Sequence, residues 1–392
     1  MTRILTRRTA LLGLSAAVSL GRASLAVAAA PTDRRFVVVM LRGALDGLSA
    51  VTPYGDPMLR DLRGPIVLGE PTKADGLLDL GGFYGLHPAL GGLHSMYRAG
   101  EMLAVHAVAG AWRSRSHFEA QDFMEFGADH RMSSGWLNRV AGVIVPTKGA
   151  AETALAVTPA LPLLLRGPAQ AATWLPQSFQ HPEAELYARI AALHAADKVT
   201  GPALRAGLSE RGFTEAVLAG AEVPANKFAF PSLAGTAGRL LADPAGPRLA
   251  ALEIGGWDTH TGQLGRLVGP LKQLDEGMVA LKDGLGEAWR KTAVLVMTEF
   301  GRTVRVNGTS GTDHGTGTVA FVLGGGVAGG RVMANWPGLS ELFENRDLQP
   351  TLELRALAKG VLAQHLGLDR NALAKVFPDS VAEAPVKGLL RA

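Results

Sequence analysis

Five acidic and imidazole side chains in this sequence have the chemistry of metal ligands. Asp258 and His260 are two residues apart, Asp313 and His314 are adjacent, and Asp46 stands far from both pairs. Carboxylate combined with imidazole suits Zn²⁺ or Mn²⁺, whereas an all-oxygen set suits Ca²⁺ or Mg²⁺. Adjacent Asp and His side chains can also serve two ions about 3.5–4 Å apart. The set therefore predicts a divalent metal site, Zn²⁺ or Mn²⁺, with one or two ions. The alternative for any single pair is an aspartate that caps a loop beside a structural histidine.

Ser116 is the candidate nucleophile, with Ser114 as its alternative. It stands where a helical pattern begins, and the free N–H groups at a helix N-terminus stabilise an alkoxide. A serine activated by a metal ion can attack a phosphoryl or sulfuryl centre. The local sequence also fits an ordinary N-cap, because Glu119 three residues later would complete a capping box. The two roles are compatible.

Four further side chains are assigned to an anionic substrate, since guanidinium groups in particular bind its oxygens. They are Arg115, His117, Glu299 and Arg302. The alternative for Arg302 is a surface salt bridge. The other histidines lack a partner motif and are interpreted as structural or exposed: His87, His94, His106, His130, His181, His194 and His365.

The candidate residues follow apolar runs that predict buried strands. These runs cover residues 36–41, 102–108, 154–157, 248–254, 292–297 and 319–323. Residues 88–98 and 264–289 carry apolar side chains at helical spacing. Alternating strands and helices predict an α/β fold, a three-layer sandwich with a mostly parallel central sheet. Ligands of such sheets bind beyond the carboxyl ends of the strands, which is where Asp46, Asp258 and Glu299 stand.

The mature chain, residues 31–392, is expected to form one domain. With 392 residues and a hydrophobic content of 47%, the chain can bury a large core. Residues 160–247 are rich in alanine, punctuated by proline and without a strand run. They predict a helical cap or insertion beside the sheet.

The N-terminus has the features of a twin-arginine export signal. Arg7 and Arg8 precede an apolar run from Ala10 to Leu20 that is too short to span a bilayer. Small residues follow, so residues 1–30 predict a signal peptide that is cleaved after Ala28 or Ala30. The twin-arginine translocase is then a partner during export, and the folded product is periplasmic or secreted, with no stable membrane span. A first helix of the mature fold is the alternative, but nothing polar alternates with the apolar run.

The composition excludes several classes of protein. The chain has no cysteine, which rules out disulfides and thiolate metal sites. Its formal net charge is +4, and the basic residues are scattered rather than gathered in a stripe, so nucleic acid is not expected as a partner. The run Gly324-Gly325-Gly326 lacks the Lys-Ser/Thr of a nucleotide-binding loop.

Several motifs together resemble a known family, the exported "domain of unknown function 1501" proteins. That family resembles the alkaline phosphatase/sulfatase superfamily, and the resemblance covers nearly all of the mature chain. Besides the twin-arginine leader, the motifs are Arg42-Gly43-Ala44-Leu45-Asp46-Gly47, Ser116-His117-Phe118, Gly256-Trp257-Asp258-Thr259-His260, Thr298-Glu299-Phe300-Gly301-Arg302, Gly311-Thr312-Asp313-His314-Gly315, Trp336-Pro337-Gly338 and Arg346-Asp347-Leu348.

The resemblance implies an alkaline-phosphatase-like fold and a role for each candidate ligand. Asp46 is similar in position to the first metal-binding aspartate of the superfamily. Asp258 and His260 resemble the pair at one metal site, and Asp313 and His314 resemble the adjacent pair at the other.

The same resemblance assigns the nucleophile to Ser116 and implies one further histidine shortly after the Asp-His-Gly turn. Here that segment is Thr316-Gly317-Thr318-Val319-Ala320-Phe321, which contains no histidine. The implied ligand set is therefore one imidazole short.

Together these features predict an exported, metal-dependent hydrolase of small anionic esters of phosphate or sulfate. One alternative is a non-catalytic envelope protein that keeps the fold and binds a ligand or partner. Another is a metal-dependent mutase.

Overall fold

The computed structural model of this chain describes residues 32–144, 153–176, 184–198, 200–219 and 226–391. The predicted signal peptide, its two cleavage sites and His181 lie outside the described residues. Within those ranges, none of the helices combines the length and the apolar character that a membrane crossing requires.

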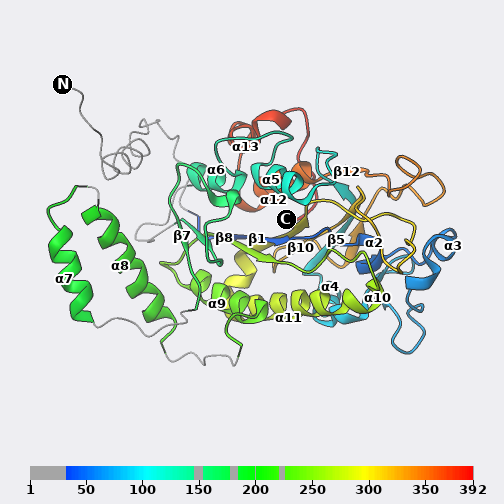
Figure 1. Cartoon of the computed structure of the whole chain (residues 1–392), viewed down its shortest axis with the longest axis horizontal. Helices are drawn as coiled ribbons and strands as arrows, with labels where there is room; N and C mark the ends of the chain where they lie inside the picture. Colours follow the sequence, from blue (N-terminus) through cyan, green and yellow to red (C-terminus); the bar gives the residue numbers. More distant parts are fainter. Residues whose placement is uncertain (1–31, 145–152, 177–183, 199, 220–225, 392) are drawn as a thin grey trace, which may run out of the picture.

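A nine-stranded sheet forms the middle layer of the molecule (Figure 1). Its order is β11-β5-β10-β9-β1-β8-β6-β7, and β12 also pairs with β5. The strands are β1 (Arg35–Leu41), β5 (Met102–Ala109), β6 (Ala154–Ala156), β7 (Ala171–Thr173), β8 (Leu249–Ile254), β9 (Thr292–Thr298), β10 (Thr318–Leu323), β11 (Arg331–Met333) and β12 (Leu352–Glu353). The pairs are parallel except for those that β10 makes with β5 and β9.

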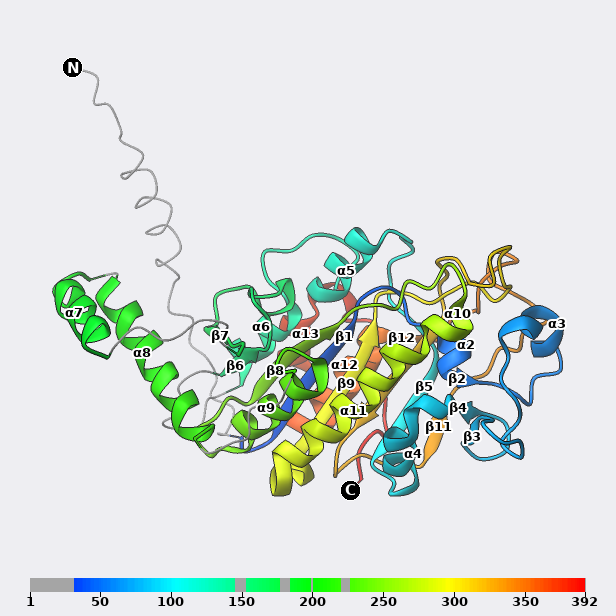
Figure 2. The ribbon, with the colours of Figure 1, turned by 60° about the horizontal axis from the view of Figure 1, so that its bottom comes forward.

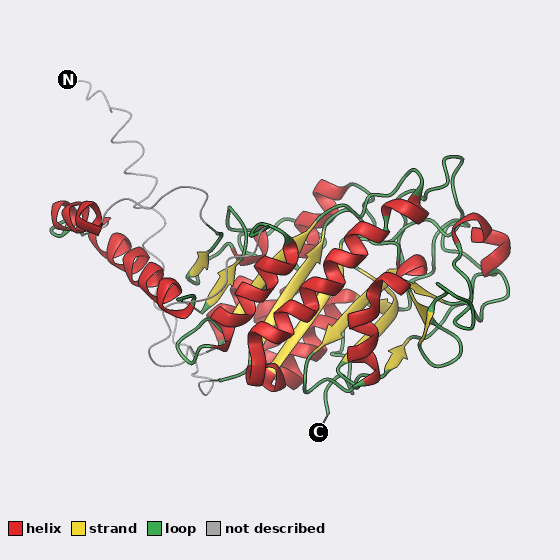
Figure 3. Ribbon diagram, turned by 90° about the horizontal axis from the view of Figure 1, so that it is seen from below, coloured by secondary structure: helices red, strands yellow, loops and turns green. Residues whose placement is uncertain are grey.

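Helices cover both faces of this sheet (Figures 1 and 3). One face carries α4 (Gly91–Arg98), α9 (Phe230–Ala242) and α11 (Val268–Leu285); the other carries α5 (His117–Phe126), α6 (Trp136–Val143), α12 (Leu354–Leu366) and α13 (Arg370–Val376). The predicted three-layer α/β sandwich with a mostly parallel sheet is therefore confirmed.

The central strand β1 is apolar along its whole length because both of its faces are buried. Its even-numbered side chains from Phe36 to Met40 enter the core beneath α5 and α12, and its odd-numbered ones from Val37 to Leu41 enter the core beneath α9 and α11. Successive side chains of a strand point to opposite faces, so a strand with helices on both sides needs apolar residues throughout.

Smaller elements lie at the margins of the sandwich. They are the three-stranded sheet of β2 (Val51–Thr52), β3 (Leu78–Asp79) and β4 (Gly85–Leu86), the short helices α2 (Gly47–Ala50), α3 (Leu59–Arg63) and α10 (Gln263–Arg266), and the 3₁₀ turns Gly64–Ile66, Pro88–Leu90, Leu163–Leu165, Gly286–Lys291 and Pro378–Ser380.

The predicted helical insertion is narrower than residues 160–247. This stretch contains β7, which extends the main sheet, and α9, which packs closely against α11. Of the described helices in this stretch, α7 (Ala184–His194) and α8 (Thr200–Val217) project beyond the β7 edge, and the C-terminal end of α8 packs against the core through Phe213 and Val217 (Figure 2). The short apolar run in β7 gave no strand signal because it covers only three residues.

The loops that carry the candidate site residues lie along one edge of the sheet. Strands β1, β8 and β9 are parallel, and two antiparallel steps through β10 make β5 parallel to them. The carboxyl ends of β1, β5, β8 and β9 therefore share this edge with the amino end of β10.

Two buried histidines make the fold sensitive to acid. His106 and His365 each place Nε2 within hydrogen-bond distance of a backbone carbonyl, at 2.9 Å and 2.8 Å. Burial lowers the pKa of each to about 4, from about 6.5 in the unfolded chain. Between these values the unfolded state binds more protons, so stability is full above pH 6.5 and falls as the pH drops towards 4.

We expect the metal-free protein to lose up to about 3 kcal/mol of unfolding free energy for each of the two histidines between pH 7 and pH 4. His365→Gln should flatten that pH dependence, because the protonation difference of His365 is removed. The free energy of unfolding, measured with urea at pH 7.5, 6 and 5, tests this expectation. If that free energy depends on pH in the variant as it does in the wild type, the role of His365 is contradicted.

Candidate metal centre

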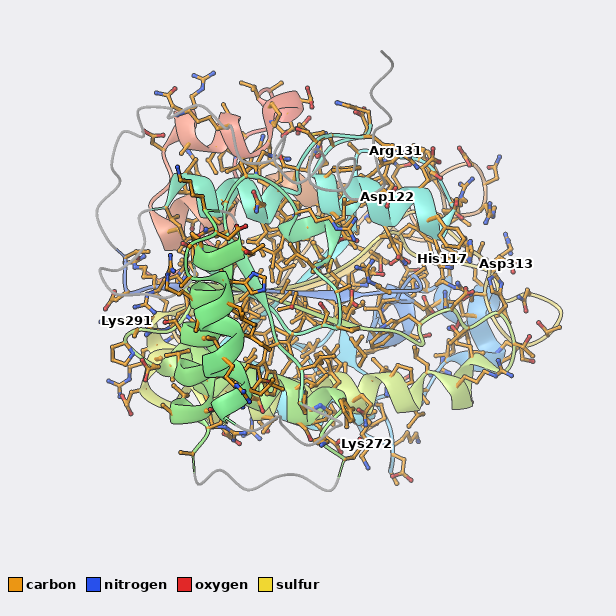
Figure 4. All side chains as sticks on the ribbon, turned by 60° about the vertical axis from the view of Figure 1, so that its left-hand side comes forward. His117, Asp122, Arg131, Lys272, Lys291 and Asp313 are labelled. Carbon is orange, nitrogen blue, oxygen red and sulfur yellow. The ribbon has the colours of Figure 1, made fainter. Side chains whose placement is uncertain are left out.

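Three segments bring imidazole and carboxylate side chains to the shared sheet edge. His117 is the first residue of α5, Asp258 and His260 follow β8, and Asp313 and His314 precede β10. In Figure 4, His117 and Asp313 lie on one side of the molecule and Lys291, which precedes β9, lies on the opposite side.

The side chains meet at Oδ1 of Asp258. Nε2 of His260 lies 2.9 Å from this oxygen, Nε2 of His314 lies 3.0 Å from it, and Nε2 of His117 lies 3.5 Å from it. The Nε2 atoms of His260 and His314 are themselves 3.0 Å apart. We call His117, Asp258, His260 and His314 the imidazole cluster.

The other ring nitrogen of each histidine faces an acceptor. The acceptors are Glu299 Oε1 for His117 at 2.8 Å, Asp313 Oδ1 for His260 at 2.9 Å, and the carbonyl oxygen of Arg115 for His314 at 2.7 Å. Carbonyl and ionised carboxyl oxygens only accept, so each Nδ1 carries the proton and donates it. In the neutral rings, Nε2 is then an unprotonated atom with a lone pair directed into the cluster.

This arrangement fits a cation. Lone pairs that face one another and a carboxylate oxygen at about 3 Å repel unless a proton or a metal ion lies between them. Nε2 of His117 is buried without a hydrogen-bond partner, and one ligand atom each of His117, Asp258 and His314 lies within 4.8 Å of the others. Histidines that bind metal usually donate their second N–H to a carboxylate or carbonyl, as all three do here.

The charges at the cluster favour an ionised carboxylate beside a cation. Burial raises the pKa of Asp258, but the hydrogen bond and the positive charge of Arg302 outweigh it and hold the pKa at about 2. The hydrogen bond to Glu299 raises the pKa of His117, whereas burial lowers that of His314.

Arg302 does not have the position predicted for a substrate contact. Its side chain is fully buried, and its guanidinium donates to Asp258 Oδ1 at 2.6 Å and to both oxygens of Thr312. The surface salt bridge considered as its alternative does not describe it either. Arg302 ties the segment after β8 to the segment before β10.

Glu299 is likewise too deeply buried to touch a substrate. Its Oε1 accepts hydrogen bonds from His117, Gln121 and the backbone of Gly43, and its Oε2 accepts one from Thr298. Burial raises its pKa, but these hydrogen bonds outweigh that effect and lower it overall. Glu299 is therefore an ionised acceptor that orients His117.

Asp46 lies outside the cluster, and its contacts do not support the predicted ligand role. Its carboxylate caps α2 through Leu48 N, at 3.2 Å, and also accepts from Ser49, Arg63 and Gln263. A carboxylate has about four lone-pair sites, and four donors occupy them here. Asp46 and Arg63 form an ion pair in which both side chains are 1% exposed.

Ser116 is the N-cap residue of α5, but its side chain makes no capping hydrogen bond. The capping box with Glu119 that the sequence suggests is absent. Ser116 is exposed beside His117, while the hydroxyl of Ser114 accepts a hydrogen bond from the Ser116 amide at 3.2 Å. Arg115, assigned to the substrate from sequence, pairs with Glu344 at 2.6 Å and with Asp347 at 2.7 Å.

Two further roles in this site differ from the sequence interpretation. His117, predicted as a substrate contact, lies among the candidate ligands, and Asp313, predicted as a ligand, accepts from His260 and Asn307. A histidine next to the candidate nucleophile at a helix start was the available signal for His117. The hydrogen bond from His260 lowers the pKa of Asp313.

Two glycines allow neighbouring loops at the site to approach one another closely. Gly43 has a φ of +122°, and a Cβ there would lie 3.0 Å from the amide nitrogen of Asp258. A Cβ at Gly311 would collide with the backbone of His260. Only glycine permits both the close approach and, at position 43, the backbone conformation.

Comparisons with known proteins give a family and several distant structures. No match was found among curated proteins. The C-terminal periplasmic domain of EptC from Escherichia coli, in complex with Zn, is 10% identical over 78% of this chain and 77% of that chain, with a TM-score of 0.38. A protein in the alkaline phosphatase superfamily from Vibrio parahaemolyticus is 11% identical over 84% and 71%, with a TM-score of 0.33.

The family match agrees with the expectation from the motifs. The family model described as "Protein of unknown function (DUF1501)" matches residues 93–377, which include the whole imidazole cluster. This chain belongs to the DUF1501 family.

Proposed function

We propose that this chain is an exported, metal-dependent hydrolase of small phosphate or sulfate esters. The observation that carries the proposal is the convergence of three imidazole Nε2 atoms on one oxygen of Asp258. Export through the twin-arginine pathway to the periplasm or beyond is part of the same proposal and rests on the Arg7-Arg8 leader.

The imidazole cluster would hold the ion. Nitrogen ligands combined with one carboxylate suit Zn²⁺ or Mn²⁺. We favour a single ion, because Asp46 and Asp313 are engaged by other side chains. A bound divalent cation would lower the pKa of a nearby hydroxyl and stabilise the charge that develops on the ester oxygens.

Ser116 is the proposed nucleophile. Its exposed hydroxyl is not used as a cap, so the amide N–H groups in the first turn of α5 have no side-chain acceptor from this position. Such N–H groups bind phosphate or sulfate oxygens. In this mechanism Ser116 attacks the ester in line, the alcohol leaves, and water then cleaves the seryl ester. Ser114 remains the alternative nucleophile.

A hollow beside α5 offers room for the rest of the substrate. It has a volume of about 560 Å³ and is lined in part by Gln121, Asp122 and Arg131. His117 and Gln121 are one helical turn apart on the same face of α5, so the hollow begins next to the cluster. Figure 4 shows Asp122 and Arg131 on the same side of the molecule as His117. We therefore expect an organic ester rather than a bare inorganic anion.

A non-catalytic ligand-binding protein is the second candidate, and one contact favours it. The buried guanidinium of Arg302 lies 2.6 Å from Asp258 and already neutralises that carboxylate. A neutral carboxylate–guanidinium pair attracts a cation less strongly. Elemental analysis of natively exported protein distinguishes the two, since the hydrolase requires about one equivalent of Zn or Mn and the binding protein requires none.

Ser116→Ala tests the nucleophile. With Zn²⁺ or Mn²⁺ supplied, we expect it to lower the turnover of aryl phosphates or sulfates by at least about 10³-fold, because loss of a nucleophile removes the covalent route. Metal content should not change. Ser114→Ala tests the alternative nucleophile: a loss of that size in this variant, with activity retained in Ser116→Ala, would assign the attack to Ser114. Wild-type protein that cleaves nothing in a broad panel of these esters contradicts the proposed function.

Glu299→Gln tests the orientation of His117. A neutral amide can donate to Nδ1 and so shift the proton to Nε2, which would then face the cluster protonated. We expect the Zn²⁺ affinity to fall about 10- to 100-fold, measured by competition with a chromophoric chelator. Glu253→Gln is the control, because Glu253 pairs with Arg42 at 2.6 Å and does not contact His117. Equal losses in both variants would contradict the role of Glu299.

A further inference from the structure

One buried amide joins the two segments that carry the candidate ligands. Oε1 of Gln263 accepts from the hydroxyl of Thr259, at 2.8 Å, and from the hydroxyl of Thr312, at 2.6 Å. Thr259 lies between Asp258 and His260, and Thr312 directly precedes Asp313. Gln263, Thr259 and Thr312 are all at most 2% exposed.

The orientation of that amide is determined by Asp46. The nitrogen of Gln263 donates to Asp46 Oδ2 and to the hydroxyl of Ser49, at 3.1 Å. An ionised carboxylate only accepts, so the NH₂ group must face Asp46 and the oxygen must face the two threonines. Arg63 pairs with the same carboxylate and supplies a buried positive charge beside it. The buried network is satisfied in one arrangement only.

We infer that Asp46 and Gln263 are positioning residues of the ion site: through Thr259 and Thr312 they set the distance between its two ligand-bearing loops. The inference rests on the proposed function. Asp258 and His260 come from one loop and His314 from the other, so a metal ion must bind across the gap between them. Metal–ligand distances tolerate about ±0.2 Å, which makes this gap critical for affinity.

Other contacts join the same loops without Gln263. The amide of Thr312 donates to the carbonyl of Thr259 at 3.2 Å, and Arg302 contacts both Asp258 and Thr312. The fold should therefore survive loss of the Gln263 amide, and the loss should appear as a change in loop spacing.

Gln263→Met keeps the length of the side chain and removes its hydrogen bonds. We expect the Zn²⁺ affinity to fall about 10-fold or more, as for other residues that orient ligands. In the metal-free protein, hydrogen exchange of the Thr312 amide should become faster. Gln349→Met is the matched control, since Gln349 is exposed and its amide donates to the carbonyl of Pro350, outside this network; both quantities should stay at the wild-type level.

A double-variant background separates positioning from general destabilisation. When Thr259 and Thr312 are both changed to Val, Gln263→Met should alter Zn²⁺ affinity by less than about twofold, because its effect passes through those hydroxyls. Additive losses would overturn the inference, as would wild-type affinity and exchange in the single variant. If the wild type binds no Zn²⁺ or Mn²⁺, the proposed function fails, and the exchange of the Thr312 amide alone decides whether Gln263 positions the loops.

Discussion

Three imidazole nitrogens and a carboxylate oxygen occupy one small space at the edge of the sheet, and each of them presents a lone pair to the others. The distances at Asp258 Oδ1 are 2.9, 3.0 and 3.5 Å. The three Nδ1 protons are donated outwards, so the rings cannot relieve the repulsion by changing tautomer without breaking those hydrogen bonds. A positive charge inside the cluster resolves the conflict. Glu299 and Asp313 therefore act by holding the lone pairs in place.

The apolar pattern of the sequence predicts most strands of the sheet, but it does not predict the direction of a strand or the presence of a very short one. Runs such as residues 36–41 and 292–297 predict buried strands, and β1 and β9 occupy them. Residues 319–323 were also predicted as a strand, but an apolar run carries no information about direction, and β10 is antiparallel to its neighbours. This direction lets the loop before β10 stay at the shared edge, since no crossover is needed. The strand β7, with three residues, is too short to show a pattern.

The sequence identifies the residue types at the site, but it does not distinguish the candidate ligands from the residues that orient those ligands. Asp258, His260 and His314 were predicted together and lie together. A carboxylate directly after a strand is also the usual N-cap of the next helix, and Asp46 has that role in α2. Its partner Gln263 is 217 residues away along the chain, a separation at which local pattern carries no information about contact.

The segment after Gly315 lacks the histidine that the superfamily resemblance implies, yet the cluster holds three imidazoles. His117 supplies the third from the start of α5, which follows β5, the neighbour of β10 in the sheet. Because Arg302 neutralises Asp258, the imidazoles rather than carboxylates would provide most of the ligand field. Ca²⁺ and Mg²⁺ require several charged or carbonyl oxygens, which this cluster does not offer, whereas Zn²⁺ and Mn²⁺ accept nitrogen ligands. The cluster thus has three imidazoles without that histidine, and the third lies beside Ser116, so the position of α5 places both His117 and the candidate nucleophile.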